Sequence, residues 1–241
     1  MGSFFKKIDM KKILYTSLVL LLLISFSSSS VFAAAPPEKD GVIFSGTTAC
    51  GKKIALTFDD GPHPYKTMQI LDLLDKFGVK ATFFIIGENA EYYPEIVAEE
   101  AVRGHELANH SFTHPRLSKL TDAEISAEIE RADAAIKKAS GVTPRLFRPP
   151  EGAYSPVVVK IASELSKSTI IWTVDTLDWA KTPCDKIVEN VKTSVTYGSI
   201  ILFHDYTGKD THTLEALEVI VPYLQGEGYE FVTVSELLKG K

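Results

Sequence analysis

Residues 54–62 read IALTFDDGP, an apolar run that ends in two adjacent carboxylates and then in Gly61-Pro62. The run has the character of a buried strand, and the glycine and proline after it indicate a turn. Two like charges side by side repel each other, and each costs free energy to remove from water. We therefore expect Asp59 and Asp60 to stand at the end of a buried strand and to have a chemical function there.

From residue 52 onward, short apolar runs alternate with amphipathic stretches. The runs predicted as strands are 54–58, 81–86, 105–110, 145–149, 168–174, 199–204 and 229–234. The stretches predicted as helices are 66–77, 91–101, 122–138, 156–165, 185–195 and 213–224, and residues 121–124 match the capping box that begins a helix. Alternating strands and helices favour a parallel sheet covered on both faces. Seven such units predict an α/β fold, a distorted (β/α)7 barrel, with an open doubly wound sheet as the alternative.

Polar side chains collect at the ends of the predicted strands. The strand interiors carry almost no titratable or cationic groups, whereas five of the seven ends carry them. These five ends are Asp59-Asp60, residues 109–115, residues 148–152, Asp175 with Asp178-Trp179, and His204-Asp205. In barrels of parallel strands, the chemistry takes place at the C-terminal ends of the strands. We therefore expect the active site at that end of the barrel.

His110 and His114 are four residues apart, a spacing that brings two imidazoles to one face of a helical turn. Such a pair is a weak signal by itself, because short motifs match by chance. Two histidines with one aspartate, and with positions left for water, are the ligand set of a catalytic divalent site. Nitrogen and oxygen ligands suit zinc, cobalt, nickel or iron better than calcium or magnesium. Hydrolysis at such a site also needs a general base and a general acid.

Five segments at the strand ends match, in order, the motifs of a known family. They are TFDDGP at 57–62, HSFTH at 110–114, RPPEG at 148–152, DTLDW at 175–179 and LFH at 202–204. On these motifs the chain resembles the polysaccharide deacetylases, which are carbohydrate esterase family 4 and carry the NodB-homology domain. The resemblance covers residues 52–238. It implies metal-assisted hydrolysis of N-acetyl groups on a polysaccharide or oligosaccharide, with release of acetate.

The resemblance implies a role for each matched residue near the metal. Asp60, His110 and His114 correspond to the ligands of one divalent ion, for which zinc is expected and cobalt or nickel are alternatives. Asp59 corresponds to the general base. Arg148 corresponds to the residue that pairs with this base and keeps it ionised.

The other matched residues concern the leaving group and the acetyl pocket. His204 corresponds to the general acid, and Asp178 to the carboxylate that orients it and raises its pKa. Trp179 and Leu202 correspond to positions that wall the acetyl pocket. The backbone N–H of Glu151 corresponds to a hydrogen-bond donor to the oxyanion.

One position departs from the family pattern, which commonly has an aromatic residue where Glu151 stands. The backbone N–H is unaffected, so we expect the departure to alter the choice of substrate rather than the reaction, with Tyr154 supplying aromatic surface. The glycan remains open between peptidoglycan N-acetylglucosamine, N-acetylmuramic acid and a chitin-like chain. O-acetyl esterase activity on xylan is the alternative reaction. A catalytically silent carbohydrate-binding relative is the alternative class, which the complete set of matched residues disfavours.

The first 33 residues have the pattern of a secretory signal peptide. Lys11 and Lys12 precede an apolar run at 13–26, and VFA at 31–33 suits cleavage. We expect residues 34–51 to be a linker with a short strand at 42–44, followed by the catalytic domain at 52–241. The protein is then expected to be secreted or associated with the cell wall. If the segment is not cleaved, it would instead anchor the protein at the membrane.

Charge and cysteine content limit the expected partners. The formal charge is −5, and loss of residues 1–33 would change it to −8. This balance disfavours nucleic acid as a partner, because nucleic-acid binding needs a basic surface. We expect an N-acetylated glycan as the partner and a monomeric protein. Cys50 and Cys184 lie far apart in the sequence, which leaves open whether they form a disulfide.

Overall fold

The computed structural model describes residues 38–47, 50–205 and 211–239, which all belong to one compact unit. The predicted signal peptide at residues 1–33 lies outside the described residues, so it stays a prediction. No helix within the described ranges is long and apolar enough to cross a membrane. Cys50 and Cys184 are free thiols.

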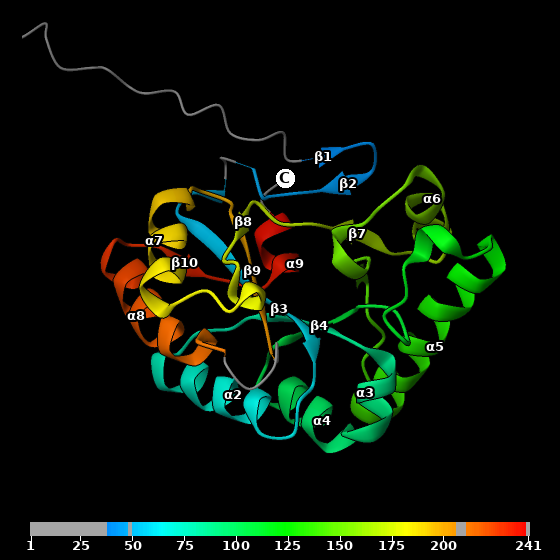
Figure 1. Ribbon diagram of the computed structural model, residues 1–241, viewed down its shortest axis with the longest axis horizontal. Coiled ribbons are helices and arrows are strands. Elements are labelled where there is room, and N and C mark those ends of the chain that lie inside the picture. Colours follow the sequence, from blue (N-terminus) through cyan, green and yellow to red (C-terminus); the bar gives the residue numbers. More distant parts are fainter. Residues whose placement is uncertain (1–37, 48–49, 206–210, 240–241) are drawn as a thin grey trace, which may run out of the picture. The chain divides into compact units, whose positions relative to one another are not determined.

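Short strands form a curled central sheet, which helices surround (Figure 1). The strand order is β1 (Glu38–Lys39), β2 (Val42–Ile43), β7 (Ser168–Ile170), β6 (Leu146–Phe147), β5 (Glu106–Asn109), β4 (Thr82–Ile85), β3 (Lys53–Gly61), β9 (Ile200–His204) and β8 (Val174–Asp175), and β10 (Glu230–Phe231) pairs with β3. Among the described strands, every pairing is parallel except that of β1 with β2. The parallel sheet predicted from the alternation of strands and helices is confirmed.

One interrupted strand brings the two ends of the sheet towards each other. β7 pairs with β6, whereas β8, which follows after residues 171–173, pairs with β9 at the far end of the strand order. The backbone N–H of Thr173 donates to the carbonyl of Ile200 at 3.0 Å. The strand predicted at 168–174 is therefore two short strands. The resulting fold is the predicted distorted (β/α)7 barrel and not an open doubly wound sheet.

The helices lie on the outside of the sheet, with α7 and α8 on one side of the view, α2 and α4 below, and α5 and α6 on the other side (Figure 1). Their bounds are α2 (Lys66–Phe77), α3 (Gly87–Tyr92), α4 (Pro94–Val102), α5 (Asp122–Ser140), α6 (Pro156–Glu164), α7 (Cys184–Ser194), α8 (Thr213–Gly226) and α9 (Val234–Leu238). The capping box predicted at residues 121–124 begins α5. The long helices lie close to their predicted ranges because their apolar periodicity is strong.

One predicted helix and one further predicted strand differ from the structure. The helix predicted at 91–101 begins instead at Pro94, and a separate helix, α3, precedes it. Proline is favoured in the first turn of a helix, where its missing N–H is not needed. The strand predicted at 229–234 ends early because Thr233 and Glu236 form a second capping box, which begins α9.

Residues 38–47, predicted as part of a linker, pack against the barrel. β2 pairs with β7 in parallel, and the N–H of Ile171 donates to the carbonyl of Ile43 at 2.8 Å. The side chain of Val42 is fully buried. The strand predicted at residues 42–44 is present, and the described part of the predicted linker is an additional edge of the sheet.

The side chains of β3 separate two parts of the core. Ile54, Leu56 and Phe58 belong to the large cluster between the sheet and the helices. Ala55 belongs to a smaller cluster inside the barrel. Because alternate residues of a strand face opposite sides, Asp59 follows Ala55 and Thr57 towards the barrel interior.

Gly87 supplies a test of the packing behind the site, because α3 lies close to α5 there. A Cβ at this position would lie 2.6 Å from Cδ2 of Phe112 and 2.7 Å from Cα of Ala132. We expect Gly87→Ala to lower the free energy of unfolding by about 1–3 kcal/mol through overpacking, measured by urea denaturation. Gly226→Ala is the control, because no atom lies within 4 Å of its added Cβ. Equal unfolding midpoints for the two variants would contradict the close approach.

Candidate active site

A β-bulge at the end of β3 separates the two adjacent carboxylates. The register of β3 with β4 shifts between Asp59 and Gly61. Asp60 has a φ of 73°, in the left-handed region that side chains other than glycine seldom adopt. The alternation of faces therefore ends at Asp60. Asp59 stays on the inward face and is 3% exposed, whereas the side chain of Asp60 is 32% exposed.

Asp60, His110 and His114 form a compact cluster of possible metal ligands. Oδ1 of Asp60 lies 3.4 Å from Nε2 of His110 and 3.3 Å from Nε2 of His114. One ligand atom from each residue lies within 4.8 Å of the others. The same Oδ1 of Asp60 is buried without a hydrogen-bond partner. A carboxylate oxygen and two imidazole nitrogens that converge in this way fit a zinc-like divalent ion.

The charges around this cluster favour a cation at its centre. Burial acts to raise the pKa of Asp60, but the neighbouring imidazoles, His110 above all, lower that pKa to about 2. Burial acts to lower the pKa of His110, but Asp59 and Asp60 outweigh it and raise that pKa. Burial and the neighbouring His110 lower the pKa of His114. The two carboxylates therefore place negative charge where the two imidazoles meet.

His110 is oriented by a backbone carbonyl. Its Nδ1 lies 2.8 Å from the carbonyl oxygen of Arg148, so an Nδ1–H donates there and Nε2 is left to face Asp60. A hydrogen bond of this kind fixes the tautomer and the ring orientation of a metal-binding histidine. His110 follows β5 and Arg148 follows β6, two adjacent strands. The pairing of these strands therefore sets the direction of one ligand.

Arg148 and Asp59 form an ion pair inside the barrel. Arg148 is fully buried, and its Nη1 donates to Oδ1 of Asp59 at 2.5 Å and to Oγ1 of Thr57 at 2.9 Å. Its guanidinium lies 3.9 Å from the ring centroid of Phe84. Burial lowers the pKa of Arg148, against the effect of Asp59. The other carboxylate oxygen of Asp59 lies 3.6 Å from Nε2 of His110, on the side of the ligand cluster.

His204 and Asp178 form a second charged pair on the other side of the cluster. Nδ1 of His204 lies 2.8 Å from Oδ1 of Asp178, whose Oδ2 accepts from the His204 backbone N–H at 2.9 Å and from Thr213 at 2.8 Å. Asp178 is fully buried. Burial acts to lower the pKa of His204, but the hydrogen bond and charge of Asp178 raise it to about 9. His204 is therefore protonated at neutral pH, with its Nε2 on the side of the pocket.

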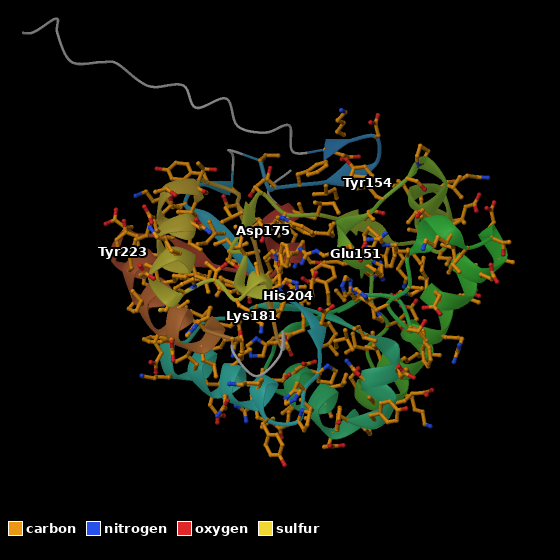
Figure 2. The ribbon with its side chains drawn as sticks, in the orientation of Figure 1. Glu151, Tyr154, Asp175, Lys181, His204 and Tyr223 are labelled. Atoms are coloured by element: carbon orange, nitrogen blue, oxygen red, sulfur yellow. The ribbon has the colours of Figure 1, made fainter. Side chains whose placement is uncertain are left out.

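The three possible ligands, Asp59 and His204 line one pocket of about 440 Å³. Figure 2 shows Glu151, Asp175 and His204 around the middle of the barrel. The lining contains the predicted site residues Asp59, Asp60, His110, His114, Glu151, Trp179, Leu202 and His204, together with Gly152, Trp172 and Asp175. Arg148 and Asp178 lie behind the wall, each bonded to a residue that lines it. The structure therefore brings together the residues that were predicted from five separate segments.

Three lining residues, Gly152, Trp172 and Asp175, were not among the predicted site residues. Trp172 lies in the break between β7 and β8, and a Cβ on Gly152 would come within 2.6 Å of its ring. Nothing in the sequence around Trp172 distinguishes it from a core residue of the predicted strand. Oδ1 of Asp175 accepts from the N–H of Leu177 at 2.9 Å and from the indole of Trp179 at 3.3 Å. Asp175 therefore orients Trp179, and its place in the DTLDW motif was the available signal.

Glu151 and Tyr154, on the same loop, have different surroundings. Glu151 lines the pocket with a φ of 58°, and its carboxylate accepts from Nε of Arg116 at 3.0 Å. Tyr154 lies outside this pocket and packs edge-on against Phe44, with ring centroids 6.1 Å apart. The predicted aromatic surface of Tyr154 therefore does not replace an aromatic side chain at position 151 in this pocket.

Comparison with known proteins gives matches along most of the chain. A family model described as polysaccharide deacetylase matches residues 46–170. A peptidoglycan-N-acetylglucosamine deacetylase of Bacillus cereus is 38% identical over 84% of this chain and 74% of its own length. A chitooligosaccharide deacetylase of Bradyrhizobium sp. is 35% identical over 80% of this chain and 93% of its own. The crystal structure of a CE4 family pseudoenzyme from Bacillus anthracis, 31% identical, has a TM-score of 0.76 and covers 84% of this chain and 69% of that one.

The Asp178–His204 pair generates a prediction about pH. Asp178→Asn removes the charge that holds His204 protonated, so the pKa of His204 should fall from about 9 towards its ordinary value of 6.5. Because the pKa is raised in the folded state, the pair stabilises the fold below about pH 6.5, and this contribution is lost as the pH rises through 9. An NMR titration of the His204 ring protons measures the shift. An unchanged pKa in the variant would contradict the assigned cause.

Proposed function

The chain belongs to the polysaccharide deacetylase family, and we propose that it hydrolyses N-acetyl groups of a glycan, leaving an amine and releasing acetate. The observation that carries this proposal is the position of Asp59. One oxygen of this carboxylate is bonded to the buried Arg148, and the other is 3.6 Å from Nε2 of His110 at the ligand cluster. A charged base that is held beside a metal site is the arrangement that hydrolysis of an amide by water requires.

Asp60, His110 and His114 would hold one divalent ion, with zinc proposed and cobalt or nickel as alternatives. Bound there, the ion supplies Lewis acidity, which lowers the pKa of water and polarises the acetyl carbonyl. The chain's own contribution is to fix the three ligand atoms before the ion binds. The hydrogen bond from His110 to the Arg148 carbonyl does this for one ligand.

Asp59 acts as the general base in this proposal. Its carboxylate accepts a proton from the water whose oxygen attacks the acetyl carbon. Arg148 holds the carboxylate in place through its hydrogen bond to Oδ1, and Thr57 accepts a hydrogen bond from the same guanidinium nitrogen. The backbone N–H of Glu151, at the pocket wall, donates a hydrogen bond to the carbonyl oxygen as negative charge develops on it.

His204 acts as the general acid. Its raised pKa of about 9 keeps the imidazolium charged at neutral pH. Nε2 then delivers a proton to the sugar nitrogen as the carbon–nitrogen bond breaks, so the nitrogen leaves as a neutral amine. The products are acetate and the free amine. Trp179 and Leu202, which line the same pocket, enclose the methyl group of the acetyl.

One of the similar structures is described as a pseudoenzyme, so similarity alone does not distinguish an active enzyme from a silent relative. The residues of the site make that distinction. A silent relative would be expected to lack a ligand, the base or the acid. This chain has all three ligand positions, a paired base and a paired acid within one pocket. These residues support an active enzyme over a silent carbohydrate-binding protein.

We further propose that the protein is exported and acts on N-acetylated glycan outside the cell or in the cell wall. The support is the signal-peptide pattern of residues 1–33. Peptidoglycan and chitin-like chains both contain N-acetylated sugars that would fit the proposed reaction. The signal-peptide boundary at residue 33 is part of the same proposal.

Separate roles for the two aspartates lead to a direct test. We expect Asp59→Asn to lower the rate of acetate release by about 10²–10⁴-fold, the usual contribution of a general base, while the variant still binds zinc. Asp60→Asn should lose zinc as well as activity. The substrates are peptidoglycan fragments, N-acetylglucosamine oligomers and acetylated xylan, assayed with added zinc or cobalt, and the metal content of each variant is measured by mass spectrometry.

Circular dichroism spectra check that both variants fold, because Asp59→Asn leaves Arg148 buried beside a neutral partner. Full activity of metal-free protein would contradict the metal site. Loss of zinc from Asp59→Asn but not from Asp60→Asn would mean that the two roles are reversed.

A further inference from the structure

A second groove, with a volume of about 670 Å³, lies between α6 and the β1–β2 hairpin. We propose that it binds a further stretch of the same glycan whose acetyl group occupies the catalytic pocket, so that the protein prefers long chains to short ones. This inference rests on the proposed deacetylase function. It assigns a role to Tyr154 and to the hairpin residues 38–43, which do not line the catalytic pocket.

The groove begins next to the catalytic pocket. Glu151 and Gly152 line the pocket, whereas Tyr154 and Ser155, on the same short loop, line the groove. Figure 2 shows Tyr154 beside the hairpin, with Glu151 nearer the middle of the barrel. A polymer with one sugar at His204 can therefore continue past Glu151 and over Tyr154.

The loop between the two spaces is fixed in position. Gly152 lies against the Trp172 ring, where a Cβ would come within 2.6 Å of it, and its φ of 64° is in the left-handed region that favours glycine. The N–H of Ala153 donates to the carbonyl of Pro150 at 3.0 Å, and that of Tyr154 donates to Gly152 at 3.1 Å. The Tyr154 ring is supported edge-on by Phe44 and remains 42% exposed. A rigid, half-exposed aromatic ring is a platform on which the apolar face of a sugar can pack.

The length of the groove suits a chain rather than a single sugar. Its lining runs from Ser155, which caps the start of α6, to Ser163 near the end of that helix, and on to Ser168. The nine residues of α6 extend over about 14 Å at 1.5 Å per residue. The groove therefore provides an extended path beside the helix.

The chemistry of the lining suits a neutral polyhydroxylated ligand. Serine residues line both ends of it, Ser155 at the start and Ser163 and Ser168 at the far end. Its charged side chains are of both signs, with Glu38 and Asp40 on the hairpin and Lys160 on α6. Lys167, at the far end, is already engaged by the carbonyl of Pro144 and by Asp133. Mixed charge without a free basic cluster does not favour an anionic ligand, whereas hydroxyls and single carboxylates can bond to sugar hydroxyls.

The test compares a short and a long substrate, the dimer and the hexamer of N-acetylglucosamine. Ser163→Trp places an indole in the groove from an exposed position, far along α6 from the catalytic pocket. We expect it to lower kcat/KM for the hexamer by about tenfold, the loss of a few aromatic and hydrogen-bond contacts, and to leave the dimer unchanged. Tyr154→Ala should lower kcat/KM for the hexamer in the same way.

The matched control is Val157→Trp, which adds the same indole to the same helix at a 44% exposed position that does not line the groove. It should leave both substrates unchanged. If Ser163→Trp and Val157→Trp give the same ratio of hexamer to dimer activity as the unmodified protein, the groove does not bind the glycan. An equal fall on both substrates in Ser163→Trp would also overturn the inference.

Calorimetry separates failure of this inference from failure of the proposed function. If no acetate is released from any substrate, the proposed function fails, and binding of the hexamer still tests the groove. We expect Ser163→Trp to weaken hexamer binding about tenfold, and Val157→Trp to leave it unchanged. Absent binding, or equal binding to the two variants, would overturn the inference.

Discussion

The buried ion pair between Arg148 and Asp59 is the interaction on which the site depends. The guanidinium is fully enclosed by the barrel and is bonded to side chains of β3 and to the backbone carbonyls of Ile170 and Ile171. The carbonyl of the same arginine fixes the ring of His110. One residue thus positions both the proposed base and a proposed ligand. Removing one partner of such a pair leaves an uncompensated buried charge, which typically costs about 3–5 kcal/mol.

The backbone at the end of β3 explains how two adjacent aspartates can have different roles. Alternation along the strand carries Asp59 into the barrel, where Arg148 offsets its charge. The bulge and the left-handed conformation of Asp60 then turn the next carboxylate towards the two histidines. Gly61 permits this path, because a Cβ there would come within 2.2 Å of Oδ2 of Asp205. Arg148 beside Asp59, and a cation bound by Asp60 and the two histidines, would offset the mutual repulsion of the two acids.

The sequence was sufficient to predict the barrel and most of the candidate site, because the site residues stand at strand ends and parallel strands bring those ends together. Asp60, His110 and His114 came from two segments, and their convergence was expected because the chemistry of a parallel barrel gathers at the C-terminal ends of its strands. The break at Trp172 was not predictable, since an unbroken apolar run at 168–174 gives no sign that half of it pairs with β6 and half with β9. The Arg116–Glu151 contact was also missed, because it joins two exposed side chains from different loops. The packing of residues 38–47 was missed for a related reason: two-residue strands carry almost no periodicity.

A crystal structure of the zinc-loaded protein tests the central claim most directly. The claim is that Asp59 pairs with Arg148 and acts as the general base, whereas Asp60 binds the metal. The account predicts a single zinc ion bound by Asp60, His110 and His114, with Asp59 outside the zinc coordination shell and still bonded to Arg148. A zinc ion bound by Asp59 in place of Asp60, or an Arg148 side chain turned away from Asp59 when zinc is present, would contradict it.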